Sequence, residues 1–256
     1  MLVNERSSEK VITPRYHHRV QNHEISIIMP SYKAADTISA ALSELCVVLT
    51  EQNYSFEVIV VIDGLVDETR SVVEALKNKN TRVIEHPINF GKGHALRTGI
   101  GRATASKYSG YVDSDSDISP WALLDALDIL DRQRDVDLVV GSKLHNDSEV
   151  SYPLFRKMQS QIFAKLIQFL FNFNIDDTQS GLKLGRAELV KKAALITATD
   201  GFAFDLEFLM RANRMGGTFA TVPIKLNYQF GSTISVRKYF ETIRDVTSIL
   251  ALSFRK

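Results

Sequence analysis

Short apolar runs alternate with amphipathic stretches along the chain from Ile25 to Val140. The runs have the length and composition of β-strands, and Phe56–Ile62 is apolar almost throughout, as expected for a strand of a parallel sheet covered on both faces. Between the runs, apolar residues recur at the spacing of amphipathic helices. The predicted strands are Ile25–Met29, Phe56–Ile62, Thr81–Glu85, Tyr108–Val112 and Val136–Val140, and the predicted helices are Asp36–Leu49, Asp67–Lys77, Gly91–Ala103 and Trp121–Arg132. This alternation predicts an α/β fold with an open, mostly parallel sheet and helices on both faces.

The second half of the chain is less regular. Leu154–Phe173 is a long helical candidate rich in Phe, Ile and Leu, and Lys238–Lys256 has the pattern of an amphipathic helix with basic ends. The segments between them are a polar loop leading into a short strand, a helix and an extended stretch, predicted at Asp176–Leu184, Asp205–Met215 and Thr218–Tyr228. We therefore divide the chain into an N-terminal tail (1–23), one folded domain (24–235) and a C-terminal amphipathic helix (236–256).

The composition is typical of a soluble globular protein that buries a hydrophobic core: of 256 residues, 45% are hydrophobic and 24% are charged. A formal net charge of +1 provides no global field that favours nucleic acid as a partner. Cys46 is the single cysteine, which excludes a disulfide framework. The sequence shows no signal peptide and no apolar run of about 18 residues. We expect a cytoplasmic protein, with peripheral attachment to the cytoplasmic membrane face as an option.

Distinctive residues follow four of the predicted strands at the point where each strand ends. They are Pro30 and Tyr32, then Asp63, then Asp113 and Asp115, then Gly141-Ser142-Lys143. Ligands of open α/β sheets bind beyond the carboxyl ends of the strands. We therefore expect these residues to line one site.

Acidic residues are concentrated in the stretch Tyr108–Pro120, where Asp113, Asp115 and Asp117 follow an apolar strand. Alternate residues of an extended segment point the same way, so the three carboxylates would share one face and repel one another. A divalent cation would relieve that repulsion, and oxygen ligands suit Mg²⁺ or Mn²⁺. The alternative is a solvated acidic turn ahead of the next helix, because Asp is common in turns.

The loop Asn89–Gly99 resembles a phosphate-binding loop but matches neither common nucleotide motif. The pair Gly91-x-Gly93 lacks the third glycine of the dinucleotide fingerprint, and Lys92 is not followed by the Ser or Thr of a P-loop. A basic, glycine-lined helix N-terminus remains, and such a terminus can hold an anion. A plain strand-to-helix turn explains the loop equally well.

Taken in order, the motifs resemble the family-two inverting glycosyltransferases, which have the nucleotide-sugar-binding GT-A fold. The matching segments are Met29-Pro30-Ser31-Tyr32, Val60–Thr69, Asn89–Gly99 and Asp113-Ser114-Asp115. The resemblance covers about Ile25 to Ser235 and is strongest to the branch that transfers mannose or glucose to polyprenyl (dolichyl) phosphate. The acceptor-side segments of that branch resemble Gly141–Lys143, Asp177–Lys183 and Phe204–Glu207. The resemblance implies a Rossmann-like GT-A catalytic domain over 24–235, with a C-terminal acceptor-side extension.

The resemblance also implies a reaction, the transfer of a hexose from a nucleoside-diphosphate sugar such as GDP-mannose or UDP-glucose with inversion at the anomeric carbon. The expected donor-binding residues are Pro30, Tyr32, Asp63, Lys92, Arg97, Asp113 and Ser114, and the expected ligands of Mg²⁺ or Mn²⁺ are Asp113, Asp115 and Asp117. Charge develops on the departing diphosphate, so a metal held there, helped by Lys92 or Arg97, would stabilise the transition state. Asp115 is thus also a catalytic candidate.

The acceptor decides whether a general base is needed. A sugar hydroxyl must lose a proton, and Asp177, Asp205 and Glu207 are the candidates to take it. A lipid phosphate is already anionic and needs cations instead, for which Lys143, Arg156, Lys183 and Arg237 are the candidates. For Asp205 and Glu207 the alternative is a helix cap and first turn, where acidic residues are favoured. Leu154–Phe173 fits either a bilayer interface or a buried core or dimer helix.

Two departures from the family pattern make the nucleobase less predictable. Leu65 stands where the family usually has Ser, and Ile62 stands where many members have a second Asp or Asn. Three other functions stay open: a soluble glycosyltransferase acting on a sugar hydroxyl of a glycan, a nucleotidyltransferase, and a non-catalytic nucleotide-sugar binder. The expected partners are the donor and a lipid-phosphate acceptor, with a membrane-anchoring partner or a homodimer left open.

Overall fold

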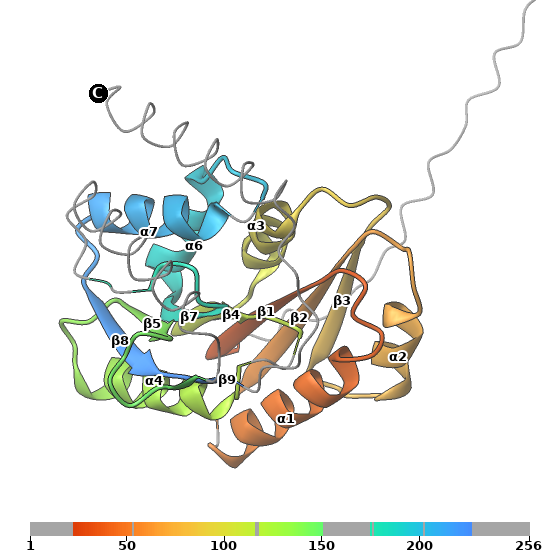
Figure 1. Ribbon diagram of the computed structural model, residues 1–256, viewed down its shortest axis with the longest axis horizontal. Helices are drawn as coiled ribbons and strands as arrows, with labels where there is room; N and C mark the ends of the chain where they lie inside the picture. The colour runs from red at the N-terminus through yellow and green to blue at the C-terminus, as the bar shows by residue number, and fades with distance from the viewer. Residues whose placement is uncertain are drawn as a thin grey trace, which may run out of the picture.

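The protein is a three-layer α/β structure in which a central sheet lies between two layers of helices (Figure 1). The computed structural model describes residues 23–52, 54–115, 118–150, 175, 177–201 and 203–226. The predicted tail over residues 1–23 therefore lies almost entirely outside the described residues, and the predicted helices Leu154–Phe173 and Lys238–Lys256 lie wholly outside them.

The sheet has seven strands in the order β3-β2-β1-β4-β7-β5-β8. Their bounds are β1 Ile25–Ser31, β2 Phe56–Asp63, β3 Thr81–His86, β4 Tyr108–Val112, β5 Leu138–Ser142, β7 Leu182–Arg186 and β8 Phe219–Pro223. β7 runs antiparallel to both of its neighbours, β4 and β5, and the other pairs are parallel. The short strands β6 (Glu149–Val150) and β9 (Lys225–Leu226) pair separately. The predicted α/β fold with a mostly parallel sheet is confirmed.

Six described helices cover the two faces of the sheet (Figure 1). They are α1 Ile38–Glu51, α2 Thr69–Ala75, α3 Lys92–Arg102, α4 Trp121–Arg132, α6 Ala187–Ile196 and α7 Phe204–Arg214. α1, α2 and α4 pack on one face, and α3, α6 and α7 pack on the other. Among the described helices, none combines the length and apolar character needed to cross a bilayer.

The apolar strands are explained by burial on both faces. Along β1, Ile27 and Met29 belong to the core under α1, whereas Ile28 between them belongs to the core under α3. β2 repeats this alternation in register with β1, so that Ile28 pairs with Ile59. Each such side chain contributes about 1.5–3 kcal/mol when fully buried. The continuous apolar pattern that predicted a parallel sheet is therefore the consequence of two cores.

Two features of the second half were not predicted. The helix α6 was missed, and the reversal of β7 has no signal in its short sequence Leu-Lys-Leu-Gly-Arg. β7 can approach β4 closely because position 110 is a glycine, where a Cβ atom would overlap the Lys183 carbonyl oxygen. This pairing places Lys183 opposite Tyr111 in the middle of the sheet. The predicted helix and extended stretch that follow are observed as α7 and as β8 with β9.

Candidate active site

The ends of β1 and β4 are tied together at the carboxyl edge of the sheet. Ser114, the residue between Asp113 and Asp115, is buried and donates a hydrogen bond from Oγ to the Pro30 carbonyl oxygen at 3.0 Å. Its own carbonyl oxygen accepts a hydrogen bond from Thr37 Oγ1 at 2.9 Å. Ser114 and Pro30, both predicted to bind the donor, therefore fix the backbone from which Asp113 projects.

Asp113 begins a chain of alternating charges that runs from the sheet edge into the interior. Its carboxylate lies 2.8 Å (Oδ1) and 3.1 Å (Oδ2) from the Lys92 ammonium at the start of α3. The Lys92 Nζ atom also lies 3.4 Å from Asp205 Oδ2. Burial alone would lower the pKa of the Lys92 ammonium, but the Asp113 and Asp205 carboxylates outweigh it and hold the pKa above its ordinary value. Lys92 is therefore held as a cation between these two carboxylates, and its contact with a donor stays a prediction.

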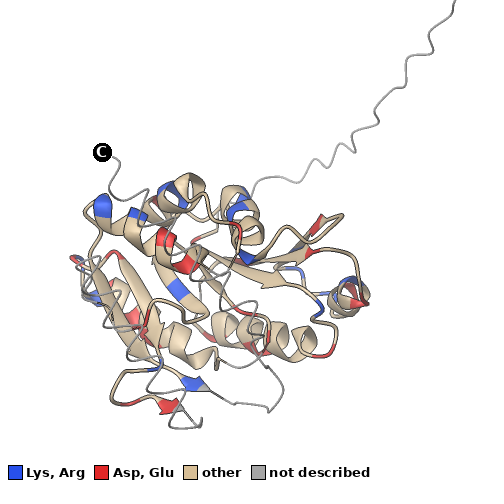
Figure 2. Ribbon diagram, turned by 45° about the horizontal axis from the view of Figure 1, so that its top comes forward, with Lys and Arg blue, Asp and Glu red and all other residues tan. Residues whose placement is uncertain are grey.

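Asp205 lies deeper, at the start of α7, and is almost completely buried. Its Oδ1 atom accepts hydrogen bonds from Lys183 Nζ at 2.5 Å and from the Tyr111 hydroxyl at 2.6 Å. Burial would raise the pKa of the Asp205 carboxyl, but Lys183 and Lys92 together lower it. Figure 2 marks acidic residues in red and basic residues in blue along the ribbon, and both kinds occur on the helices and strands around the sheet. Lys183, predicted to bind the acceptor, is wholly enclosed, with a side chain 0% exposed, and its contact with an acceptor stays a prediction.

The residues present fit a divalent cation at the end of β4. Asp113 is partly exposed, and Asp115 lies exposed two residues further on, while Asp117 lies outside the described residues. No group of three acidic, His or Cys side chains that could hold a metal gathers among the residues that the structure describes. Mg²⁺ and Mn²⁺ are commonly held by one or two carboxylates together with substrate phosphates, so Asp113 and Asp115 would be sufficient as the protein's ligands.

Asp63, at the end of β2, organises the loop between β3 and α3. Its carboxylate accepts hydrogen bonds from the backbone nitrogens of Phe90 at 3.0 Å and Gly91 at 2.7 Å. His86 Nδ1 lies 2.8 Å from the same carboxylate. The structure thus places Asp63 as a buried anchor of this loop, and contact between Asp63 and a nucleobase stays a prediction.

The glycines of the same loop are needed for close packing against residues 199–200. The backbone nitrogens of Gly93 and His94 both donate to the Asp200 carbonyl oxygen, at 2.7 and 3.3 Å. Arg97 donates to the carbonyl oxygen of Thr199 at 2.7 Å and pairs with Asp200. The N-terminus of α3 is thus engaged by protein groups. Of the loop's two cations, only Lys92 points toward Asp113.

Glu207 also serves this packing, although it lies one half-turn from Asp205 on α7. Its Oε2 atom accepts hydrogen bonds from Thr199, including one from the Thr199 nitrogen at 2.9 Å, and its Oε1 atom lies 2.8 Å from Arg211 Nη2. Burial would raise the pKa of Glu207, but the hydrogen bonds from Thr199 and Arg211 lower it. Asp205 and Glu207 therefore face different surroundings, and Glu207 binds the loop at residues 198–200, against which the N-terminus of α3 packs.

On the acceptor side, Asp177 is buried and holds the loop after β5. Its Oδ2 atom accepts a hydrogen bond from the Lys143 nitrogen at 3.0 Å and lies 3.6 Å from the Lys143 ammonium. Tyr32 is exposed beyond β1, with Lys33 Nζ 5.6 Å from its ring centroid. Arg156 and Arg237 lie outside the described residues.

The sequence analysis did not identify two residues that hold these carboxylates in place: Tyr111, which binds Asp205, and Gly181, which binds the Asp113 backbone. Tyr111 lies two residues before Asp113 on β4 and so shares its face of the sheet, which the alternation of a strand could have indicated. Gly181 contributes through its backbone: its carbonyl oxygen accepts a hydrogen bond from the Asp113 nitrogen at 3.0 Å. The contact with Gly181 cannot be deduced from local sequence, because it depends on the antiparallel pairing of β7 with β4.

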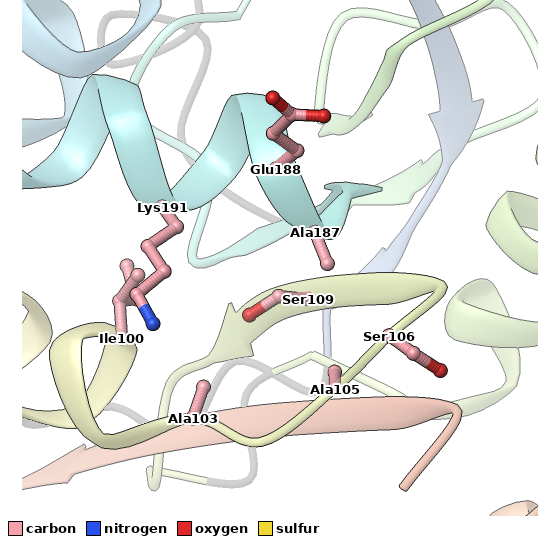
Figure 3. A pocket seen from close by; sticks show the side chains of 8 residues that line it. All are labelled: Ile100, Ala103, Ala105, Ser106, Ser109, Ala187, Glu188 and Lys191. Carbon is pink, nitrogen blue, oxygen red and sulfur yellow. The ribbon is translucent and has the colours of Figure 1, made fainter. Parts of the chain in front are cut away.

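A small pocket of about 180 Å³ lies at the other end of β4 (Figure 3). It is lined by Ile100, Ala103, Ala105, Ser106, Ser109, Ala187, Glu188 and Lys191. Ser109 lies four residues before Asp113, which corresponds to about 13 Å along a strand. The Ser109 hydroxyl has no hydrogen-bond partner among the described residues and is itself enclosed. This pocket is therefore separate from the charged site.

The fold and the acidic end of β4 place the protein in the class of GT-A glycosyltransferases. Two solved structures share the fold: glucosyl-3-phosphoglycerate synthase of Mycobacterium tuberculosis in complex with Mn²⁺, UDP and phosphoglyceric acid, and the same enzyme with Mn²⁺, UDP-glucose and phosphoglyceric acid. The first has a TM-score of 0.70 at 17% identity, over 89% of this chain and 78% of that chain. The second has a TM-score of 0.70 at 16% identity, over 90% and 80%.

The chain belongs to glycosyl transferase family 2, whose model matches residues 26–193. Curated relatives include the dolichyl-phosphate beta-glucosyltransferase of Drosophila melanogaster, 29% identical over 83% of this chain and 69% of the relative. The protein of the same name from Dictyostelium discoideum is 26% identical over 92% of this chain and 76% of the relative. The predicted family, its dolichyl-phosphate branch, the GT-A fold and the enzyme class are thus confirmed.

Proposed function

We propose that the protein transfers glucose from UDP-glucose to dolichyl phosphate or a related polyprenyl phosphate. The curated relatives are named dolichyl-phosphate beta-glucosyltransferases, and solved structures of the same fold contain UDP-glucose and Mn²⁺. The observation that carries the proposal is the pairing of Asp113 with Lys92 at the end of β4. A carboxylate that can share a cation with phosphates, beside a buried ammonium, is what a departing diphosphate requires.

In the proposed reaction, an oxygen of the acceptor phosphate attacks the anomeric carbon as the bond from that carbon to the diphosphate oxygen breaks. The acceptor phosphate is largely anionic at neutral pH, so no protein group has to remove a proton. Negative charge grows on the leaving diphosphate, and the Lys92 ammonium stabilises it there. Asp113 and Asp115 would hold the Mg²⁺ or Mn²⁺, which supplies Lewis-acid stabilisation of the same charge when bound.

This proposal assigns different roles to the carboxylates predicted as bases. Asp205 is paired with two lysines and acts as a counter-ion, and Glu207 acts by holding residues 198–199. Asp177 positions Lys143, which we assign to the acceptor phosphate together with Arg156 and Arg237. Pro30, Tyr32 and Asp63 form the nucleoside side, because they lie at the ends of the two neighbouring strands β1 and β2.

A lipid acceptor requires contact with a membrane surface, and two adjacent loops offer apolar side chains for it. Leu65, Val66 and Ile88 are 52%, 55% and 61% exposed, and Phe90 next to them is 42% exposed. The loops touch, because a Cβ atom on Gly64 would lie 3.0 Å from the Asn89 nitrogen. Contiguous exposed apolar side chains are a feature of membrane and protein contact sites. We assign this apolar loop pair (Leu65, Val66, Ile88 and Phe90) to the bilayer interface.

The decisive experiment is incubation of the purified protein with radiolabelled UDP-glucose or GDP-mannose, Mn²⁺ and polyprenyl phosphate. We expect label from UDP-glucose to partition into organic solvent, and no label from GDP-mannose. Transfer from GDP-mannose would overturn the donor assignment. Label that stays in the aqueous phase on an added oligosaccharide would instead establish a hydroxyl acceptor, for which Asp177 would be the candidate general base.

A further inference from the structure

The two oxygens of the Asp205 carboxylate face different lysines, at different distances. Oδ1 accepts short hydrogen bonds from Lys183 Nζ at 2.5 Å and from the Tyr111 hydroxyl at 2.6 Å. Oδ2 faces the Lys92 ammonium at 3.4 Å, whereas Lys92 lies 2.8 Å from Asp113 Oδ1. Lys92 is therefore held more closely by the carboxylate at the sheet edge than by the carboxylate in the interior.

Lys183 is an unusual residue for its position in the middle of a sheet. It belongs to β7, its side chain is 0% exposed, and its ammonium also donates to the Ser180 carbonyl oxygen at 2.7 Å. Apolar residues of similar volume often replace a buried ion pair with no loss of stability, so stability alone does not account for a lysine here. Its place beside Asp205 suggests that it controls the charge of that carboxylate.

We propose that Lys183 is a positioning residue that keeps Asp205 from capturing Lys92. With Lys183 and Tyr111 on Oδ1, the Asp113, Lys92, Asp205 and Lys183 side chains form two balanced ion pairs, and Lys92 stays at the Asp113 edge. This inference rests on the proposed function, in which Lys92 faces the donor diphosphate. Without the Lys183 ammonium, Asp205 carries an uncompensated negative charge in the interior and draws Lys92 inward, away from the diphosphate.

The same lysine supports the neighbouring carboxylate through the backbone. The Ser180 carbonyl oxygen that it binds belongs to the turn containing Gly181. The Gly181 carbonyl oxygen accepts the hydrogen bond from the Asp113 nitrogen at 3.0 Å. Lys183 thus contacts Asp205 directly and the turn that holds the Asp113 backbone, which is the placement expected of a group that sets the position of the Lys92 ammonium.

The test compares binding of UDP and UMP, because only UDP carries the β-phosphate that Lys92 is proposed to face. Calorimetry with the full chain and Mn²⁺ gives the preference for UDP over UMP. We expect Lys183→Met to lower that preference by about tenfold, the loss typical of one hydrogen bond to a charged group. UMP affinity should stay within about twofold, because the β-phosphate contact is not involved. Lys92→Met gives the full loss for reference.

A charge-balance variant separates positioning from simple destabilisation. In Lys183→Met/Asp205→Asn the interior carboxylate is neutral, so Lys92 is no longer drawn inward, and the UDP preference should return toward the wild-type value. The matched control is Arg211→Met, which breaks the other buried ion pair of α7, between Glu207 and Arg211. We expect it to lower the melting temperature and leave the UDP preference unchanged.

Several outcomes would overturn the proposal. One is a Lys183→Met variant that is less stable but keeps the wild-type UDP preference, as expected of Arg211→Met. Another is a double variant that does not recover the preference. If Lys183→Met does not fold, Tyr111→Phe repeats the test, because it removes only one hydroxyl from Oδ1 and should lower the preference to a smaller extent. No UDP binding by the wild-type protein would refute the proposed donor as well, whereas UDP binding with an unchanged preference in the variants would refute the positioning role alone.

Discussion

Gly181 packs directly against the carboxylate of Asp113, so that a Cβ atom on Gly181 would overlap Asp113 Oδ2. The turn that contains Gly181 therefore fixes where the proposed metal ligand points. We expect Gly181→Ala to displace Asp113 and to reduce glucosyl transfer by at least about 100-fold, the scale of a misplaced catalytic group. Steady-state rates with UDP-glucose and polyprenyl phosphate measure this loss, and circular dichroism checks that the protein remains folded.

Gly101→Ala is the matched control for this substitution. Gly101 lies in α3, where the nearest atom to an added Cβ is Leu195 Cδ2 at an ordinary 3.6 Å. Alanine at this helical position, in the last turn of α3, should stabilise the protein by up to about 0.5–1 kcal/mol and leave transfer unchanged. Wild-type activity in Gly181→Ala would contradict the role of the turn.

Glu207→Gln should destabilise the protein, because Glu207 holds both Arg211 and the backbone of residues 198–199. We expect a loss of about 3 kcal/mol at pH 7, as for the breaking of a buried ion pair. The folded-state pKa of Glu207 is lowered, so its stabilisation is complete above the unfolded pKa of about 4.3 and is lost as the pH falls through the folded pKa. Urea unfolding should therefore show the difference between wild type and variant shrinking on acidification below about pH 4.3.

Glu188→Gln provides the comparison for Glu207. Glu188 forms an exposed pair with Lys192 one turn along α6, with side chains 80% and 64% exposed. Exposed pairs of this kind contribute little, so this variant should unfold like the wild type at pH 7 and also below about pH 4.3. Equal behaviour of the two variants would show that the buried contacts of Glu207 do not stabilise the fold.

The first half of the fold could be predicted from the sequence because each strand there is buried on both faces. Phe56–Ile62 is apolar for that reason, and the strand bounds found for β2 differ from the prediction by one residue. β7 could not be predicted as an antiparallel strand, since nothing in its short sequence indicates its direction, and its close packing on Gly110 of β4 joins residues far apart in the chain. The register that follows from this pairing is what brings Lys183 and Tyr111 together.

The candidate site was predictable only where chemistry and strand ends coincide. Asp113 and Lys92 were identified by residue type and place, and the structure brings them within 2.8 Å. Arg97 has the same charge as Lys92 and lies on the same helix, yet it is directed to Thr199 and Asp200. Local sequence does not distinguish the two, because each side chain is directed by residues distant in the sequence, Thr199 for Arg97 and Asp113 with Asp205 for Lys92.

Asp115→Asn should abolish metal-dependent transfer and leave the fold intact, because Asp115 is exposed and follows the strand end. The amide keeps the shape of the side chain but removes the charge that would hold Mg²⁺ or Mn²⁺. Titration of Mn²⁺ followed by electron paramagnetic resonance measures metal binding independently of activity. Asp128→Asn, at an exposed position of α4, is the control and should behave like the wild type. Full transfer by Asp115→Asn, or by the wild type without divalent metal, would contradict the metal assignment.

The apolar loop pair should bind a bilayer through side chains that come from two different loops. We expect Leu65→Ser/Ile88→Ser to reduce sedimentation with phosphatidylcholine vesicles by at least about tenfold, since each removed side chain contributes about 1.5–3 kcal/mol when buried in an apolar phase. Val47→Ser/Leu195→Ser removes two apolar side chains of similar exposure, 54% each, from α1 and α6 on opposite faces of the sheet, and should not change sedimentation. Equal loss in both double variants would show that binding follows general surface hydrophobicity. No loss in either would place the membrane contact on another surface of the protein.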